Sequence, residues 1–234
     1  MTNQDYKNAA LAALKGKWAP AVLATIMILV LLIPYFAFSF GTQYITEAAQ
    51  TDPTSVPSWF WWGFLGVMAY FLLFVTPIAD VGYFNANKLL LKEGDDRVTA
   101  NMFKIGLNPW LRNFWGLFLM GLKLFLWYLL LIIPGIIKAF GYALTPFLLV
   151  DCPELTPLQC IKLSDKMMKG HKFDLFYLYL SFIGWALLGI LTLGIGYLWL
   201  YPYMYTSVAA FYEDVKAQYQ EQVSAEAPAD GYQK

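Results

Sequence analysis

The chain has 234 residues, of which 59% are apolar and only 14% are charged. A soluble globular domain carries about 25% charged residues, so this composition excludes the ordinary soluble classes. The mean hydropathy of +0.50 points the same way. The low charged fraction and the high mean hydropathy place the chain in the class of membrane proteins. The net charge is zero, but the charged residues are unevenly placed along the chain.

The first part of the chain predicts two membrane spans separated by an external loop. Residues 1–17 are polar, with apolar side chains at helical spacing, and predict a weakly amphipathic helix. The apolar run 18–40 exceeds the ~20 residues that a span needs. Residues 41–58 contain no Lys or Arg and predict an external loop. The second span, 59–84, opens with three tryptophans typical of an aromatic belt and contains Pro77, a predicted kink.

Two long apolar blocks follow the basic segment 85–112. The first, 113–150, is interrupted by Pro134-Gly135, and the second, 173–212, by Gly194-Ile195-Gly196. At 1.5 Å per residue, each block is long enough for two helices close to the lower limit for crossing. Charge bias does not separate true hairpins from re-entrant ones, and we favour true hairpins. The six predicted spans are 18–40, 59–84, 113–133, 136–150, 173–193 and 197–212.

The distribution of basic residues predicts the topology. Fourteen of the 16 Lys and Arg residues lie in 1–17, 85–112, 151–172 and the tail, and the predicted external loops contain none. The positive-inside rule therefore places both termini in the cytoplasm. We expect an all-α membrane protein with amphipathic interfacial helices, comprising one integral domain, 1–223, and a disordered tail, 224–234.

The segment 156–172 is a strongly polar stretch inside the otherwise apolar C-terminal half. Thr156, Pro157 and Gln159 form a capping box with proline at the first helical position, and Gly170 is suited to end the helix. Asp165 precedes Lys169 by four residues, a favourable helical pair. We expect an interfacial helix, with a solvated linker helix as the alternative. Its basic face comprises Lys162, Lys166, Lys169 and Lys172.

Three ionisable residues lie inside the apolar segments: Asp80, Lys123 and Lys138. Charges at membrane depth are costly and are usually paired or face a cavity. Lys123 lies near the predicted midplane, so we hypothesise that it pairs with Asp80 or that the two line a polar cavity. The alternative is that each side chain reaches its nearer interface, which suits Asp80 and Lys138 better than Lys123.

The sequence predicts no catalytic or metal site. His171 is the sole histidine and has no identifiable partner for acid–base catalysis, and Ser164 is too far from it along a helix to form a triad. Cys152 and Cys160 are too few for a metal site. No phosphate-binding motif, cofactor motif or nucleic-acid patch is present, so no cofactor is expected.

Several motifs in order carry a resemblance to a known family. LIIPGIIKAFGYALTPFLLVDCPELTP, CIKLSDKMMKGHKFDLF, LSFIGWALLGILTLGIGYLWLYPY and AFYEDV, with the opening ALKGKWAPAV, resemble the bacterial integral membrane family catalogued as domain of unknown function 975. The resemblance implies a six-span protein of the bacterial cytoplasmic membrane and no particular activity. The chain is also distantly similar to the membrane domains of glycerophosphodiester phosphodiesterases, without room for their catalytic domain.

The expected function is therefore non-catalytic. We expect a membrane scaffold or accessory subunit whose basic cytoplasmic face meets anionic lipid headgroups or a membrane protein partner, and no nucleic acid. The alternative is a transporter or lipid-handling protein that uses Lys123 and Asp80 in a polar cavity.

Overall fold

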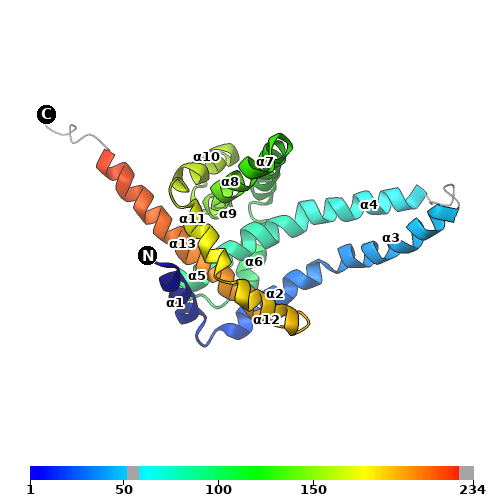
Figure 1. The fold of residues 1–234 in the computed structure, drawn as a ribbon, viewed down its shortest axis with the longest axis horizontal. Helices are drawn as coiled ribbons and strands as arrows, with labels where there is room; N and C mark the ends of the chain where they lie inside the picture. The colour runs from blue at the N-terminus through cyan, green and yellow to red at the C-terminus, as the bar shows by residue number, and fades with distance from the viewer. Residues whose placement is uncertain (52–57, 227–234) are drawn as a thin grey trace.

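The computed structural model of the protein describes residues 1–51 and 58–226, and within these ranges the chain forms helices and no strand. This confirms the predicted all-α fold (Figure 1). The α-helices are α1 (Asn3–Leu14), α2 (Trp18–Leu31), α3 (Ile33–Thr51), α4 (Ser58–Tyr70), α5 (Tyr83–Glu93), α6 (Val98–Leu107), α7 (Trp110–Leu130), α8 (Ile132–Tyr142), α9 (Thr145–Asp151), α10 (Pro157–Met167), α11 (Lys172–Leu180), α12 (Ile183–Leu191) and α13 (Tyr197–Glu226). Two π-helical segments, η2 (Phe71–Val75) and η3 (Pro77–Gly82), link α4 to α5.

The N-terminal helix α1 packs one side against the bundle. Thr2 and Asp5 form a capping box that satisfies backbone N–H groups at its start. Tyr6, Ala10 and Leu14 recur on one side and are buried, and α1 packs against α13. The first residues of the chain are therefore part of the core and do not form a free extension.

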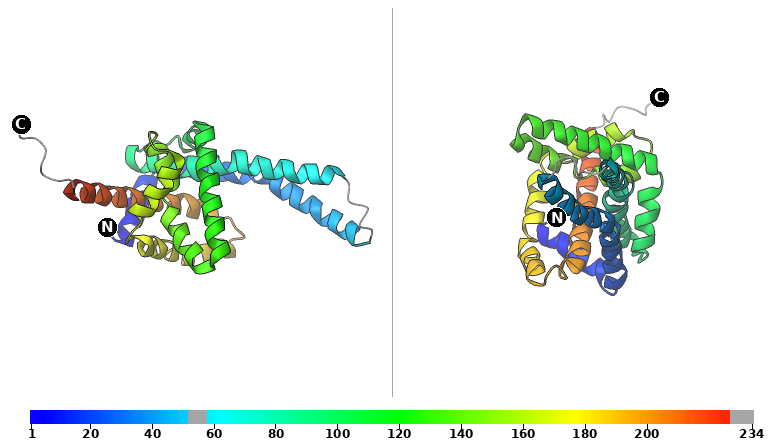
Figure 2. Two further views of the ribbon diagram at one scale, coloured as in Figure 1. Left: turned by 90° about the horizontal axis from the view of Figure 1, so that it is seen from above. Right: turned by 90° about the vertical axis from the view of Figure 1, so that its right-hand side faces the viewer.

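The α3–α4 hairpin extends away from the rest of the molecule (Figures 1 and 2). Phe38 of α3 stacks on Phe60 of α4, with ring centroids 5.7 Å apart. The structure corrects the predicted external loop, because α3 continues to Thr51 and residues 41–51 are helical. No proline occurs in this stretch, so the helix meets no backbone barrier there. Residues 52–57 of the predicted loop lie outside the described residues.

The interruption predicted at Pro77 takes the form of the two π-helical segments. The backbone N–H of Thr76 donates to the carbonyl of Phe71, and that of Tyr83 donates to Ile78, so each hydrogen bond spans five residues. Proline lacks an N–H group and its ring clashes with the carbonyl four residues earlier. A widened turn relieves this clash while the helix continues towards α5.

A close contact between η3 and α6 depends on two glycines. A Cβ atom on Gly82 would lie 2.1 Å from the carbonyl oxygen of Met102, and one on Gly106 would lie 2.6 Å from the Cα of Ile78. The two backbones therefore approach more closely than any side chain allows. Small residues commonly mediate such contacts between membrane helices.

The break in the apolar block 113–150 lies slightly earlier than predicted. The predicted break was Pro134-Gly135, but Leu131 is extended and separates α7 from α8. Pro134 lies in the first turn of α8, where a missing N–H group costs no helical hydrogen bond.

In the block 173–212 the predicted break is confirmed, since Gly194 has a φ of +91° between α12 and α13. A further break separates α11 from α12.

The last helix, α13, forms the centre of the bundle. Seven consecutive residues, 206–212, are all buried, so the helix is covered on every side over about two turns. It contacts α1, α2, α5, α10, α11 and α12. The predicted disordered tail begins too early, because residues 224–226 continue α13, while 227–234 lie outside the described residues.

Within the described residues, five helices are long and apolar enough to cross a membrane. They are Trp18–Gln43, Trp59–Glu93, Trp110–Leu130, Ile132–Asp151 and Lys172–Leu191. The predicted sixth span, 197–212, is not among them. Five of its residues are tyrosines, and residues 206–212 are buried in the protein, whereas Trp199 and Tyr201 are exposed.

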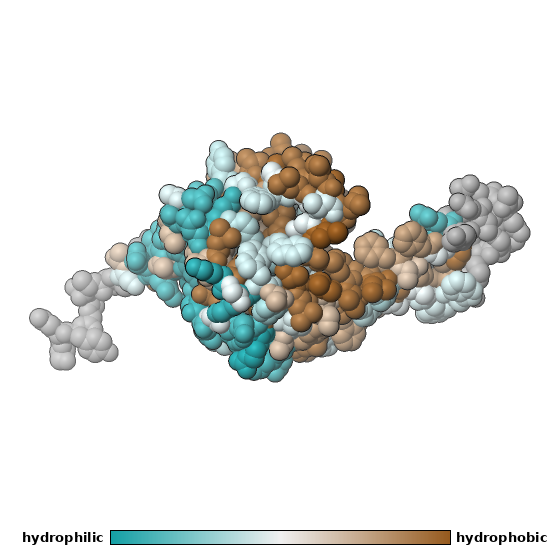
Figure 3. Space-filling model, turned by 90° about the horizontal axis from the view of Figure 1, so that it is seen from below, coloured by the Kyte–Doolittle hydropathy of each residue, from teal (hydrophilic) through white to brown (hydrophobic). Residues whose placement is uncertain are grey.

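The surface is divided between a polar end and an apolar side. Figure 3 shows hydrophilic surface towards the end from which the C-terminal residues emerge, and hydrophobic surface towards α3 and α4. The predicted belt residues Trp59, Trp61 and Trp62 are each at least 60% exposed. An apolar surface of this extent is typical of a lipid-facing region.

Candidate functional site

The two predicted intramembrane charges, Asp80 and Lys123, are not paired with each other. Asp80 lies on η3 and Lys123 lies midway along α7. Among the ion pairs between described residues, none includes either side chain. The structure therefore does not support the Asp80–Lys123 ion pair, and a role for either residue in a cavity stays a prediction.

Lys138, the third predicted intramembrane charge, belongs to a cluster centred on Asp165. The ammonium group of Lys138 donates to Asp165 Oδ2 at 2.6 Å, and that of Lys172 lies 3.3 Å from Asp165 Oδ1. Lys138 also lies over the rings of Trp127 and Tyr142, at 5.4 and 5.9 Å from their centroids. This Asp165 cluster joins α8, α10 and α11. The predicted Asp165–Lys169 pair is wrong, because Asp165 is turned towards α8 and α11.

The Asp165 cluster predicts a pH-dependent contribution to stability. Partial burial alone would raise the pKa of Asp165, but the hydrogen bonds from Lys138 and Lys172 hold it below its ordinary value. A carboxyl group whose pKa is lower in the folded state than in the unfolded state stabilises the fold at pH values above its unfolded-state pKa, which is near 4. This stabilisation is lost as the pH falls towards the folded-state pKa. Asp165→Asn should therefore lower the free energy of unfolding by about 1–2 kcal/mol near neutral pH. The difference should shrink below about pH 4.

Thermal unfolding in detergent, followed for the wild type and Asp165→Asn between pH 7 and pH 3, measures this difference. Comparison at each pH cancels the titration of the other carboxylates. A difference that stays constant over this range would contradict the assigned role of the Asp165 charge.

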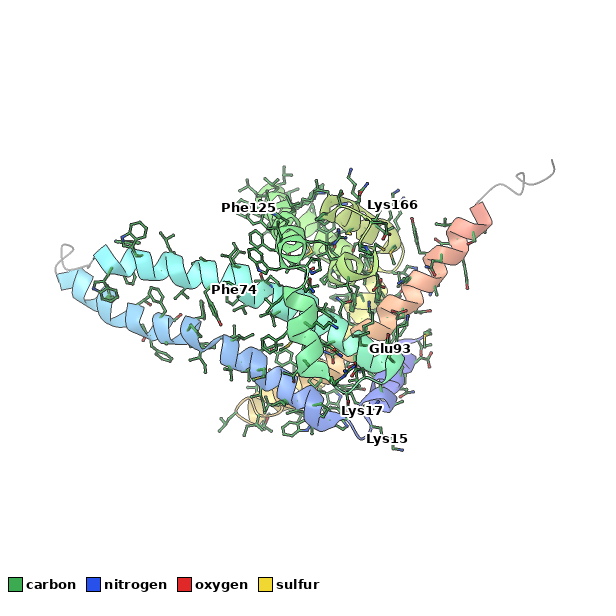
Figure 4. The ribbon with its side chains drawn as sticks, turned by 180° about the vertical axis from the view of Figure 1, so that it is seen from behind. Lys15, Lys17, Phe74, Glu93, Phe125 and Lys166 are labelled. Carbon is green, nitrogen blue, oxygen red and sulfur yellow. The ribbon has the colours of Figure 1, made fainter. Side chains whose placement is uncertain are left out.

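Helix α10 has buried residues on one side and exposed residues on the other. The capping box of Thr156 and Gln159 is confirmed, and Gly170 has a φ of +90°. Buried residues on the inner face are Cys160, Ile161, Ser164, Met167 and Met168. The side chains of Lys162, Lys166 and Lys169 are exposed, and Figure 4 shows Lys166 on the outer side of the helix. Lys172, which was predicted for the same face, lies instead on α11 and pairs with Asp165. We refer to the other three lysines as the α10 basic face.

Ser164 and His171 occupy structural positions. The Ser164 hydroxyl is fully buried, donates to the carbonyl of Gly141 at 2.8 Å and accepts from the N–H of Leu144 at 3.2 Å. His171 contacts Asp174 at 3.3 Å. Both hydrogen bonds of Ser164 go to backbone groups at the end of α8, so this serine fixes α10 against α8.

A second charged cluster, which the sequence did not reveal, lies deeper in the bundle. Asp151 at the end of α9 accepts hydrogen bonds from Lys88 of α5 and from Tyr212 and Lys216 of α13. The Tyr212 and Lys216 contacts measure 2.7 and 2.5 Å. The side chains of Lys88 and Asp151 are only 7% and 14% exposed. This Asp151 cluster joins three helices that are far apart in the sequence.

Aromatic rings enclose the Asp151 cluster. The rings of Phe147 and Tyr212 are stacked with centroids 4.5 Å apart, and the Lys88 ammonium lies 5.6 Å from the Tyr212 centroid. Burial alone would lower the pKa of Lys216, but the hydrogen bond and charge of Asp151 raise it above its ordinary value. The cluster is therefore a charged structural contact.

A polar pocket of about 310 Å³ opens beside the Asp151 cluster. Its lining includes Lys88, Lys216 and, at the end of α5, Lys92 and Glu93, the last of which Figure 4 labels. The Asn85 side-chain amide donates to Val81 and Pro146, while its buried Oδ1 has no hydrogen-bond partner among the described residues. Acidic and basic groups are mixed in this pocket, so its charge favours no single class of ligand.

One comparison with known proteins gives a match. Residues 116–219 match the model of a family described as protein of unknown function (DUF975). This region extends from α7 into α13 and contains the whole Asp165 cluster, but neither Asp80 nor Lys88. No curated protein and no solved structure matches the chain. The match supports the resemblance to domain of unknown function 975, and no comparison supports the one to glycerophosphodiester phosphodiesterase membrane domains.

Proposed function

We propose that this chain is a non-catalytic membrane scaffold or accessory subunit of a bacterial cytoplasmic membrane. Its termini and the α10 basic face lie on the cytoplasmic side, where basic residues are retained. In this arrangement the α10 basic face binds anionic headgroups and the acidic surface of a membrane protein partner.

The two-faced character of α10 carries this proposal. Its inner face is packed in the bundle, while Lys162, Lys166 and Lys169 point outward and make no ion pair with other described residues. By contrast, the charges of the Asp165 and Asp151 clusters are engaged in contacts between helices. Interior charges that lock helices together suit a scaffold better than a catalytic centre, which requires groups free to exchange protons.

A second candidate function is transport or lipid handling. The observation that favours it is the position of Asp80 on η3, inside the candidate span Trp59–Glu93. π-Helical turns within longer helices occur frequently at functional sites, and carboxylates at membrane depth mark ion or substrate pathways. Lys123 would belong to the same path.

Native mass spectrometry of the protein, gently extracted from its own membrane, distinguishes the two functions. The scaffold proposal predicts a protein partner at a fixed ratio, retained by the wild type and reduced at least fivefold in Lys162→Gln/Lys166→Gln. Two exposed ion pairs with a partner protein are together worth up to about 2 kcal/mol, and a fivefold change corresponds to about 1 kcal/mol.

The matched control is Lys15→Gln/Lys104→Gln, which removes the same charge from exposed positions outside α10. This control should retain the partner. A chain that carries no partner but holds a small solute, lost in Lys123→Met, would overturn the scaffold proposal in favour of transport.

A further inference from the structure

An apolar groove lies on the surface between α8 and α11. Its volume is about 480 Å³. Ala139 and Phe140 of α8, with Ala143 just after its end, line the groove together with Phe176, Tyr179 and Leu180 of α11. Both helices belong to candidate membrane spans. A groove of this kind therefore opens to the hydrocarbon region of the bilayer, where acyl chains are the surrounding solvent.

One end of the groove carries a positive charge. Lys172 precedes Phe176 by one turn of α11, so the two side chains lie on the same face. The ammonium group of Lys172 lies close to the backbone of Gly141, since a Cβ atom placed on that glycine would be 3.3 Å away. Gly141 directly follows Phe140, and Phe140 and Phe176 are in contact with centroids 5.9 Å apart. The ammonium group of Lys172 therefore lies next to one end of the groove.

The Asp165 cluster does not neutralise this charge. Asp165 carries one negative charge and is paired at 2.6 Å with Lys138, while Lys172 lies at the longer distance of 3.3 Å from its other oxygen. Two lysines thus share one carboxylate and leave one positive charge. The nearby Asp174 also carries a negative charge, but its side chain is 56% exposed and contacts His171, so solvent screens this charge and it pairs with neither Lys138 nor Lys172. An unbalanced charge next to a membrane span favours an anionic partner.

We infer that the groove between α8 and α11 binds one anionic phospholipid, with its phosphate at Lys172 and an acyl chain along the groove. The inference rests on the proposed membrane location and basic cytoplasmic face, and it assigns to them a defined lipid site. A zwitterionic lipid fills the groove equally well but brings no net charge to Lys172. The site therefore selects the headgroup by charge and holds the chain by apolar contact.

Native mass spectrometry tests this site on the full chain in mixed micelles that contain phosphatidylglycerol or phosphatidylcholine with identical acyl chains. The wild type should retain phosphatidylglycerol in preference to phosphatidylcholine. Lys172→Gln should reduce this preference about fivefold, the effect of one lysine at an anionic surface. Lys172→Arg keeps the charge and should keep the preference, which separates loss of charge from loss of fold.

Two further variants locate the lipid. Ala143→Phe fills the groove and should reduce retention of both lipids, whereas Lys104→Gln removes an exposed lysine outside both the groove and the α10 basic face and should leave the preference unchanged. An unchanged preference in Lys172→Gln, or an equal loss in Lys104→Gln, would overturn the site. Either result leaves the scaffold proposal intact, because that proposal depends on the protein partner and its loss in the α10 double variant.

Discussion

Replacing Asp151 by asparagine is expected to lower the free energy of unfolding by about 3–5 kcal/mol, the usual effect of breaking a buried ion pair. The carboxylate of Asp151 forms ion pairs with Lys88 and Lys216. Its loss leaves the two ammonium groups close together without a negative partner. Lys88 in particular is only 7% exposed, so its charge would be left buried without a partner. Denaturant unfolding in mixed micelles measures the effect.

Two variants make this prediction specific. Lys88→Met should cost less than Asp151→Asn, because Asp151 then keeps Lys216 as its partner. Lys92→Gln breaks the Lys92–Glu213 pair, whose lysine is 51% exposed, and should cost at most about 1 kcal/mol. Equal losses for Asp151→Asn and Lys92→Gln would show that the Asp151 cluster is not the buried contact described here.

Gly82→Ala is expected to destabilise the protein by about 3 kcal/mol or more, at the upper end of overpacking effects. The added methyl group would lie 2.1 Å from the carbonyl oxygen of Met102, and a backbone atom cannot be displaced by a rotamer change. Helix α6 would have to move away from η3 as a unit. The same unfolding experiment measures the loss.

The matched control is Gly66→Ala on α4, in the same candidate span. Nothing lies within 4 Å of a Cβ atom at Gly66, so this substitution should be neutral or slightly stabilising through the higher helix propensity of alanine. Similar stability for the two variants would mean that η3 and α6 are not in backbone contact.

The sequence predicted the features that depend on neighbouring residues. The start of α10 follows from Thr156, Pro157 and Gln159, and Gly194 marks the turn before α13, because caps and turns are encoded within a few positions. The α7–α8 break was displaced by three residues because proline is compatible with the first turn of a helix as well as with a break.

The charged clusters were not predictable in the same way. Asp165 has Lys169 at a favourable helical spacing, yet it binds Lys138 and Lys172 on other helices. The partners of Asp151 are 63 and 65 residues away along the chain. The available signal was that Asp151 ends an apolar run with no basic residue adjacent to it, which requires a distant partner without identifying one.

The buried position of α13 also has a consequence for biosynthesis. Its residues complete the cores of α1, α2 and α5, and the Tyr6 hydroxyl donates to Asp214 at 2.6 Å across almost the whole chain length. Because α13 is synthesised last, α1 and α5 expose the surface that α13 covers until its synthesis is complete. A chain that ends before residue 197 lacks the helix that covers these surfaces and leaves them exposed.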